Sequence, residues 1–62
     1  MFPRYIESKR ARPDMTIVLW QLADYHYELE WTGGKTKDLP ETPFEDAKKA
    51  LEDAWEHETY DG

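Results

Sequence analysis

The side chains best able to do chemistry in this 62-residue chain are its carboxylates, since 14 Asp and Glu face eight Lys and Arg. A general acid needs a carboxyl group whose pKa is raised by burial, and a nucleophilic enzyme needs an activated Ser, Thr, Cys or Lys beside a base. The chain has no cysteine, its one serine is Ser8, and no threonine lies in a phosphate-loop or nucleophile-elbow pattern. The composition therefore predicts a protein that is not an enzyme.

Two histidines raise the question of a metal site. His26 would project from the same strand face as Glu28 and Glu30, and His57 could approach from a predicted helix. Imidazole and carboxylate groups bind zinc or manganese, but the chain has no His-x-x-x-His or similar spacing. The simpler interpretation makes His26 a polar member of a strand and His57 part of a solvated helix end. We expect no metal and no other cofactor.

The carboxylates recur in two regular rows. Glu28 and Glu30 lie two apart on a predicted strand, and Glu52, Asp53 and Glu56 crowd the end of a predicted helix, where the helix dipole favours cations. Carboxylates would then repeat about every 6.6 Å on the strand and about every 5.4 Å on the helix. Such rows can occupy a basic groove that tracks a phosphate backbone. We predict these five residues as the partner-binding set, although a merely solvated acidic surface stays open as an alternative.

Strand patterns occupy the middle of the chain. Residues 25–32 alternate strictly between apolar and polar side chains, which is typical of a half-buried strand, and residues 16–22 are rich in β-branched and aromatic types. A tight turn at 23–24 would pair Trp20 with Tyr27 and bring the two apolar faces together. Ala-Asp is not a favoured two-residue turn, so a wider or bulged connection is also consistent with the pattern.

A second turn and a competing interpretation follow. Gly33-Gly34 suits a tight turn, after which residues 35–39 could return as a short edge strand with Lys37 opposite Glu30. Alternatively, one helix could run from an N-cap at Asp14 to a C-terminal cap at Gly33. The strict alternation of the second half favours strands.

The last third of the chain predicts a helix. Thr42-Pro43-Phe44-Glu45 is a capping box with proline at the first helical position. Apolar residues then recur at helical spacing, namely Phe44, Ala47, Ala50, Leu51, Ala54 and Trp55. The predicted fold class is α+β, a β-hairpin or three-stranded antiparallel meander covered by one C-terminal amphipathic helix. A helical hairpin is the alternative.

Charge divides the chain unevenly. Residues 1–12 hold four basic residues against one acid, a net +3, whereas residues 13–62 hold four against 13, a net −9. Pro13 disfavours a helical conformation at Arg12. We therefore expect a basic N-terminal arm, 1–12, followed by a single small acidic α+β domain, 13–62.

The same charges limit the class of partner. A body of net charge −9 repels nucleic acid, so direct nucleic-acid binding is not expected, although the arm alone could touch phosphates. The longest apolar stretch, residues 17–20, is too short to span a membrane, and the absence of cysteine suits a reducing compartment. We expect a cytoplasmic protein whose partner is a protein with a surface rich in lysine and arginine.

The alternating strand from Tyr25 to Trp31, the helix start Thr42-Pro43-Phe44-Glu45-Asp46-Ala47 and the acidic exterior resemble the small acidic inhibitor proteins encoded by phages. That type includes anti-CRISPR, anti-restriction and host RNA-polymerase-inhibiting proteins. The resemblance implies a non-enzymatic inhibitor that mimics nucleic acid and occupies a basic nucleic-acid-binding site on a host or defence protein. It also implies action in the cytoplasm of the host cell.

A second function class is a small structural or assembly module. In the predicted register, Ile17 and Leu19 fall on the outer sheet face beside Glu28 and Glu30. Unless Phe2, Tyr5 and Ile6 cover them, they would form an apolar patch suited to self-association, for example as a homodimer.

Overall fold

The computed structural model describes residues 1–60 as four strands followed by one helix. The elements are β1 (Arg4–Arg12), β2 (Met15–Ala23), β3 (His26–Trp31), β4 (Thr36–Leu39) and α1 (Phe44–Tyr60). The strands form one antiparallel sheet in the order β1-β2-β3-β4. The predicted α+β class, a meander covered by one helix, is confirmed, and the helical-hairpin alternative is wrong because residues 15–31 form strands and a turn.

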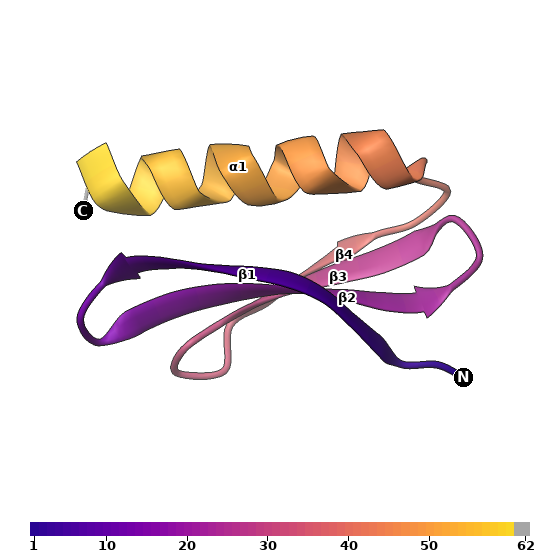
Figure 1. Cartoon of the computed structure of the whole chain (residues 1–62), viewed down its shortest axis with the longest axis horizontal. Coiled ribbons are helices and arrows are strands. Elements are labelled where there is room, and N and C mark those ends of the chain that lie inside the picture. The colour runs from indigo at the N-terminus through magenta and orange to yellow at the C-terminus, as the bar shows by residue number, and fades with distance from the viewer. Residues whose placement is uncertain (61–62) are drawn as a thin grey trace.

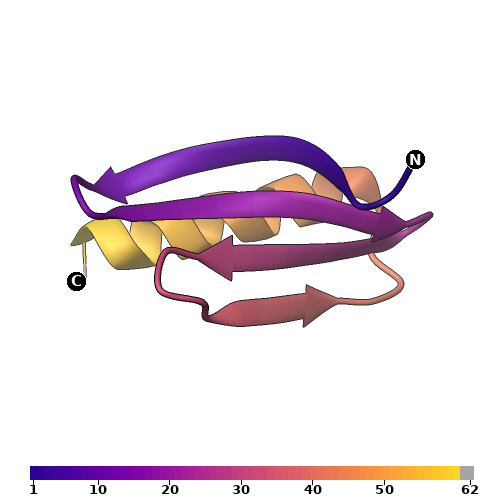
Figure 2. The ribbon, with the colours of Figure 1, turned by 90° about the horizontal axis from the view of Figure 1, so that it is seen from below.

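The molecule has two layers. Figure 1 shows α1 lying along one face of the sheet, so the other face of the sheet carries no covering element among residues 1–60. The helix packs mainly on β1 and β2. In Figure 2, β4 lies beyond the edge of the helix. This offset leaves the β3–β4 side of the sheet less covered than the β1–β2 side.

The core lies between the sheet and the helix. Its buried members are Ile17, Leu19, Tyr27, Leu29, Trp31, Ala47 and Leu51. The strand residues alternate along β2 and β3 because successive side chains of a strand point to opposite faces. The two helical members lie four residues apart and so share one face of α1, which confirms the predicted apolar stripe.

The β2–β3 register differs from the predicted one. Leu19 lies opposite Leu29, and Gln21, not Trp20, lies opposite Tyr27. The cause is the irregularity between Gln21 and Ala23, which adds one residue to β2 just before the turn. A one-residue slip moves a whole strand's side chains to the other face.

Because of this one-residue shift, the predicted apolar patch does not form on the outer face of the sheet. Ile17 and Leu19 are fully buried under the helix, so their expected place on the outer face is wrong. The outer face instead carries Val18 and Trp20, opposite Glu30 and Glu28 respectively.

Most of the basic N-terminal segment forms β1, which pairs with β2 along its length. Pro13 and Asp14 form the turn between these strands. The ladder shifts between Tyr5 and Glu7 and again between Arg10 and Arg12. Because of these shifts, Glu7 and Lys9 lie opposite the buried Leu19 and Ile17 and share the helix-facing side of the sheet.

Strand β4 forms the edge strand that the sequence predicts after Gly33 and Gly34, whose φ angles are +107° and +104°. Such positive φ values favour glycine and close the turn. Its register again differs by one, since Lys37 lies opposite Leu29 and Glu30 lies opposite Thr36. Lys37 therefore shares the helix-facing side of the sheet.

Candidate functional site

The structure divides the predicted partner-binding set between two faces of the molecule. Glu28 and Glu30 lie on the outer face of the sheet, because they alternate with the buried Tyr27, Leu29 and Trp31. The other members, Glu52, Asp53 and Glu56, lie on α1, which covers the opposite face of the sheet. One flat partner surface cannot contact both groups together.

The acidic end of α1 is paired with the basic residues of β1. Lys9 forms an ion pair with Glu52, and the Arg12 Nη2 atom lies 3.1 Å from the Glu58 Oε1 atom. Arg12 also donates from Nη1 to the Glu58 carbonyl, at 3.3 Å, near the end of the helix. Carboxylates that look unfavourable for an isolated helix therefore have cations facing them from the neighbouring strand.

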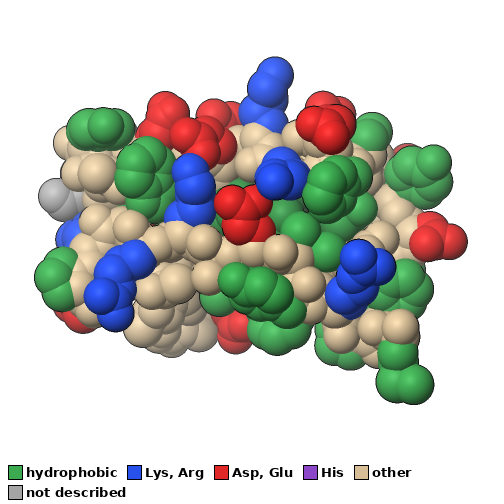
Figure 3. All heavy atoms as spheres, viewed as in Figure 1, with side chains coloured by type: hydrophobic (Ala, Val, Ile, Leu, Met, Phe, Trp, Pro, Cys, Tyr) green, Lys and Arg blue, Asp and Glu red, His purple; other side chains and the backbone are tan. Residues whose placement is uncertain are grey.

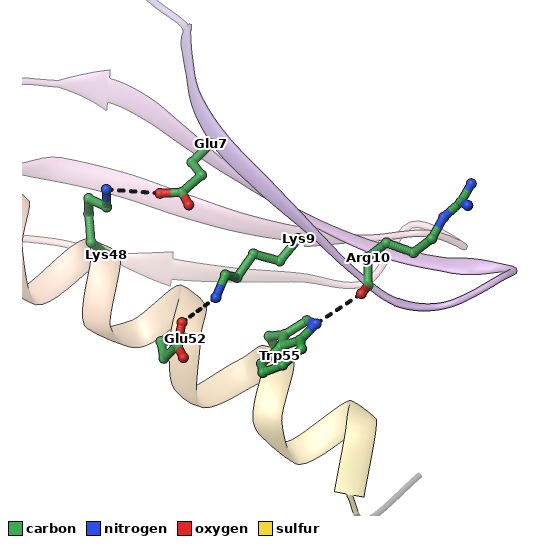
Figure 4. Close-up of polar contacts among 6 residues, drawn as sticks. All are labelled: Glu7, Lys9, Arg10, Lys48, Glu52 and Trp55. Carbon is green, nitrogen blue, oxygen red and sulfur yellow. Dashed lines mark hydrogen bonds and ion pairs between the residues drawn. The ribbon is translucent and has the colours of Figure 1, made fainter.

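Two further contacts join α1 to β1 in the same region (Figure 4). Lys48 Nζ lies 3.0 Å from Glu7 Oε1, and Trp55 Nε1 donates to the Arg10 carbonyl at 2.9 Å. Figure 3 shows the result at the surface, where red and blue side chains are interspersed across this side of the molecule. This side is mixed in charge, so it lacks the uniform negative potential that a nucleic-acid mimic needs.

The outer sheet face combines carboxylates with one exposed and one half-buried aromatic ring, those of Tyr5 and Trp20. Trp20 Nε1 donates to Glu30 Oε1 at 2.9 Å, and the Trp20 residue lies directly opposite Glu28. The Tyr5 ring meets the Trp20 ring edge to face, with centroids 6.1 Å apart and planes at 85°. Tyr5 is 55% exposed. We name these four residues, Tyr5, Trp20, Glu28 and Glu30, the acidic-aromatic patch.

Sequence patterns identified only part of this patch. Glu28 and Glu30 follow from the alternation of β3, but the predicted arm, 1–12, includes Tyr5. The predicted register lacks the extra residue of β2 and therefore places Trp20 on the inner face. Residues 4–8 do not alternate between polar and apolar types, so periodicity gives no signal for Tyr5.

The two histidines lie on different sides of the sheet. His26 Nε2 is 2.6 Å from Asp38 Oδ1 on the outer face, whereas His57 belongs to α1 on the other side. Within residues 1–60, no group of three or more His, Asp and Glu side chains is arranged to hold a metal ion.

A groove of about 470 Å³ runs between α1 and the β3–β4 side of the sheet. Its apolar lining comes from Leu29, Trp31, Ala50 and Ala54. Lys35 and Lys37 line it from the sheet side, and Asp53, His57 and Glu58 line it from the helix side. The groove exists because the helix is displaced toward β1 and β2.

Trp31 contributes an unpaired donor beside this groove. Its side chain is 7% exposed, and its indole N–H has no hydrogen-bond partner within the described part of the chain. The Lys35 ammonium group lies 4.8 Å from the centre of the Trp31 ring, a cation–π contact. A buried donor without an acceptor costs about 1–3 kcal/mol.

Comparisons of the chain with protein-family models, with curated proteins and with solved structures gave no match. The functional argument therefore rests on the geometry of the two surfaces described above. Of the helices formed by residues 1–60, none has both the length and the hydrophobicity required to cross a membrane.

Proposed function

We propose that this protein is a non-enzymatic inhibitor that binds another protein through its acidic-aromatic patch. The partner is a host or defence protein with a Lys/Arg-rich nucleic-acid-binding surface, and the patch occupies that surface in place of nucleic acid. The observation that carries the proposal is the hydrogen bond from Trp20 to Glu30 beside the exposed Tyr5 ring.

The geometry of this patch suits the recognition of lysine and arginine side chains. Glu28 has no ion pair or hydrogen bond within residues 1–60, and the only partner of the Glu30 carboxylate there is the neutral Trp20 indole. Aromatic rings beside carboxylates can bind a guanidinium or ammonium group by cation–π contact and ion pairing together. Aromatic residues and arginine also dominate the binding energy of protein interfaces.

The distribution of the other charges supports this choice of face. On the helix side, Glu52 and Glu58 already form ion pairs with basic residues of β1, so their carboxylates are less available to a second protein. Asp53 and Glu56 remain without ion-pair partners among residues 1–60, but they lie away from the acidic-aromatic patch. The net charge of −6 would steer the whole chain toward a basic partner and make association salt-sensitive.

The proposal keeps the resemblance to small acidic phage-encoded inhibitors as its biological setting. In that setting the protein acts in the cytoplasm of the host cell. Its contact residues are then Glu28 and Glu30, with Tyr5 and Trp20 as anchors. The carboxylates of α1 supply long-range attraction rather than direct contact.

A pull-down from host-cell lysate tests the proposal, with the tagged protein at low and at high salt and with nuclease present and absent. We expect a nucleic-acid-binding protein to be captured without dependence on nucleic acid and to be lost at high salt. Recovery of the tagged protein alone at both salt concentrations would contradict the proposal.

A further inference from the structure

We infer that β4 and the groove beside it bind an extended peptide segment of a partner protein. The segment adds to the sheet next to β4 and places an acidic side chain beside Lys37. This site lies at the edge of the sheet and on the helix side, so it is separate from the acidic-aromatic patch.

The first support is the hydrogen-bonding direction of β4. The Trp31 amide donates to the Lys35 carbonyl at 2.8 Å, which fixes Trp31 and Lys35 as a hydrogen-bonded pair. Because such pairs recur every second residue of an antiparallel ladder, the main chain of Lys37 also bonds to β3. The N–H and C=O groups of Thr36 and Asp38 therefore point away from the sheet and are available to an added strand.

The second support is the difference between the two edges of the sheet. The helix-facing residues Glu7 and Lys9 of β1 are already paired with Lys48 and Glu52 of α1. Strand β1 is also interrupted by two register shifts, which protect an edge from further pairing. By contrast, β4 has a regular register and lies beyond the edge of the helix.

The third support is the groove itself. With a volume of about 470 Å³, it can hold a large apolar side chain of the added strand. The apolar side chains of Leu29, Trp31 and Ala54 line it.

Charge selects the occupant. Lys37 has no ion-pair partner within residues 1–60, and a residue opposite it on the added strand would form a close, non-hydrogen-bonded pair. Opposite charges at such pairs stabilise a sheet and like charges destabilise it. An acidic side chain therefore fits at this position.

The same rule disfavours a second copy of this chain. Two antiparallel β4 strands related by a two-fold axis can form hydrogen bonds through their outward N–H and C=O groups in three registers. These registers place Lys37 opposite Lys37, Lys37 opposite Lys35, or Asp38 opposite Asp38. Each register therefore brings like charges together. The lysines at this edge therefore discourage self-pairing while they favour an acidic partner strand.

The test uses random ten-residue peptides displayed on phage, selected against the full chain. The enriched peptides are expected to carry an acidic residue two positions from a large apolar residue. On addition of a selected peptide, the amide NMR signals of Thr36 and Asp38 should shift most. Failure to enrich any peptide, or shifts confined to the acidic-aromatic patch, would overturn the inference.

Two variants separate the main-chain contact from the charge contact. Thr36→Pro removes the outward N–H without removing a β3–β4 hydrogen bond, so it should weaken binding of the selected peptide at least about tenfold. Thr36→Val keeps this N–H and should leave the affinity for the peptide within about twofold of the wild type. Selection against Lys37→Glu should enrich basic residues in place of acidic ones. Equal binding to the Thr36→Pro and Thr36→Val variants, or an unchanged charge preference, would refute the site.

Discussion

The three tryptophans differ in what their indole N–H groups contact. Trp55 donates to the Arg10 carbonyl and so ties the helix to β1. Trp31 has no partner within residues 1–60 and lies beside the groove. Trp20 donates to Glu30 on the uncovered face of the sheet. Only this last bond fixes a carboxylate on a surface that is open to a partner.

The bond between Trp20 and Glu30 should be measurable as a coupling energy. We expect a double-mutant cycle of Trp20→Phe and Glu30→Ala to give a coupling of about 1 kcal/mol in the free energy of unfolding, because the bond is charge-assisted but only half-buried. Urea denaturation of the four proteins provides the values. Strict additivity of the two single changes would show that the bond does not order this carboxylate.

The predicted and observed structures differ in the register of β2, because one extra residue moves its side chains to the other face of the sheet. The alternation of β3 and the apolar stripe of α1 follow from periodicity, so both could be predicted. The extra residue near Leu22 could not, because a bulge depends on how the turn closes rather than on side-chain pattern. This extra residue places Trp20 on the outer face, so the acidic-aromatic patch could not be predicted from the sequence.

The pairing of the β1 cations with α1 also could not be predicted from the sequence pattern. Its cations look like a solvated arm because Lys9 and Arg12 lie far along the chain from their partners. The sequence separation between Lys9 and Glu52 is 43 residues. Such pairing depends on the folded topology, and neither charge runs nor local periodicity reveal it.

At the scale of the elements, the register of β2 makes a direct prediction. Leu19→Ala should lower the free energy of unfolding by about 2–5 kcal/mol, since its side chain is fully buried. Val18→Ala, on the outer face, should cost less than about 1 kcal/mol. Chemical denaturation of both variants checks the register. A larger loss for Val18→Ala than for Leu19→Ala would contradict this register and support the one in which Val18 lies opposite Leu29.

The contact between α1 and β1 makes a second prediction at this scale. Lys9→Glu or Glu52→Lys alone should destabilise the fold by roughly 0.5–1 kcal/mol, because each places like charges together on a partly exposed surface. The double exchange should restore most of this loss, and thermal melts at low and high salt should show the single-variant penalty shrinking with salt. No recovery in the double exchange would mean that the pair does not contribute to packing.

At the scale of the whole molecule, most of the basic segment 1–12 is part of the sheet, as strand β1 (Arg4–Arg12). A 62-residue domain has a stability of only about 3–9 kcal/mol, so loss of an entire strand is severe. We expect a chain of residues 13–62 to lack a cooperative thermal transition when its unfolding is monitored by circular dichroism. A cooperative transition with retained helix content would mean that the segment is a dispensable arm, as its composition first indicated.

The most direct test of the proposed function compares two neutralising variants of equal charge change. One is Glu28→Gln/Glu30→Gln on the sheet face, and the other is Asp53→Asn/Glu56→Gln on the helix. The readout is the concentration of each protein that displaces labelled nucleic acid from the captured partner. The sheet-face variant should require at least about tenfold more protein than the wild type, and the helix variant less than about threefold more. An unimpaired sheet-face variant, or an equal loss in the helix variant, would contradict the account.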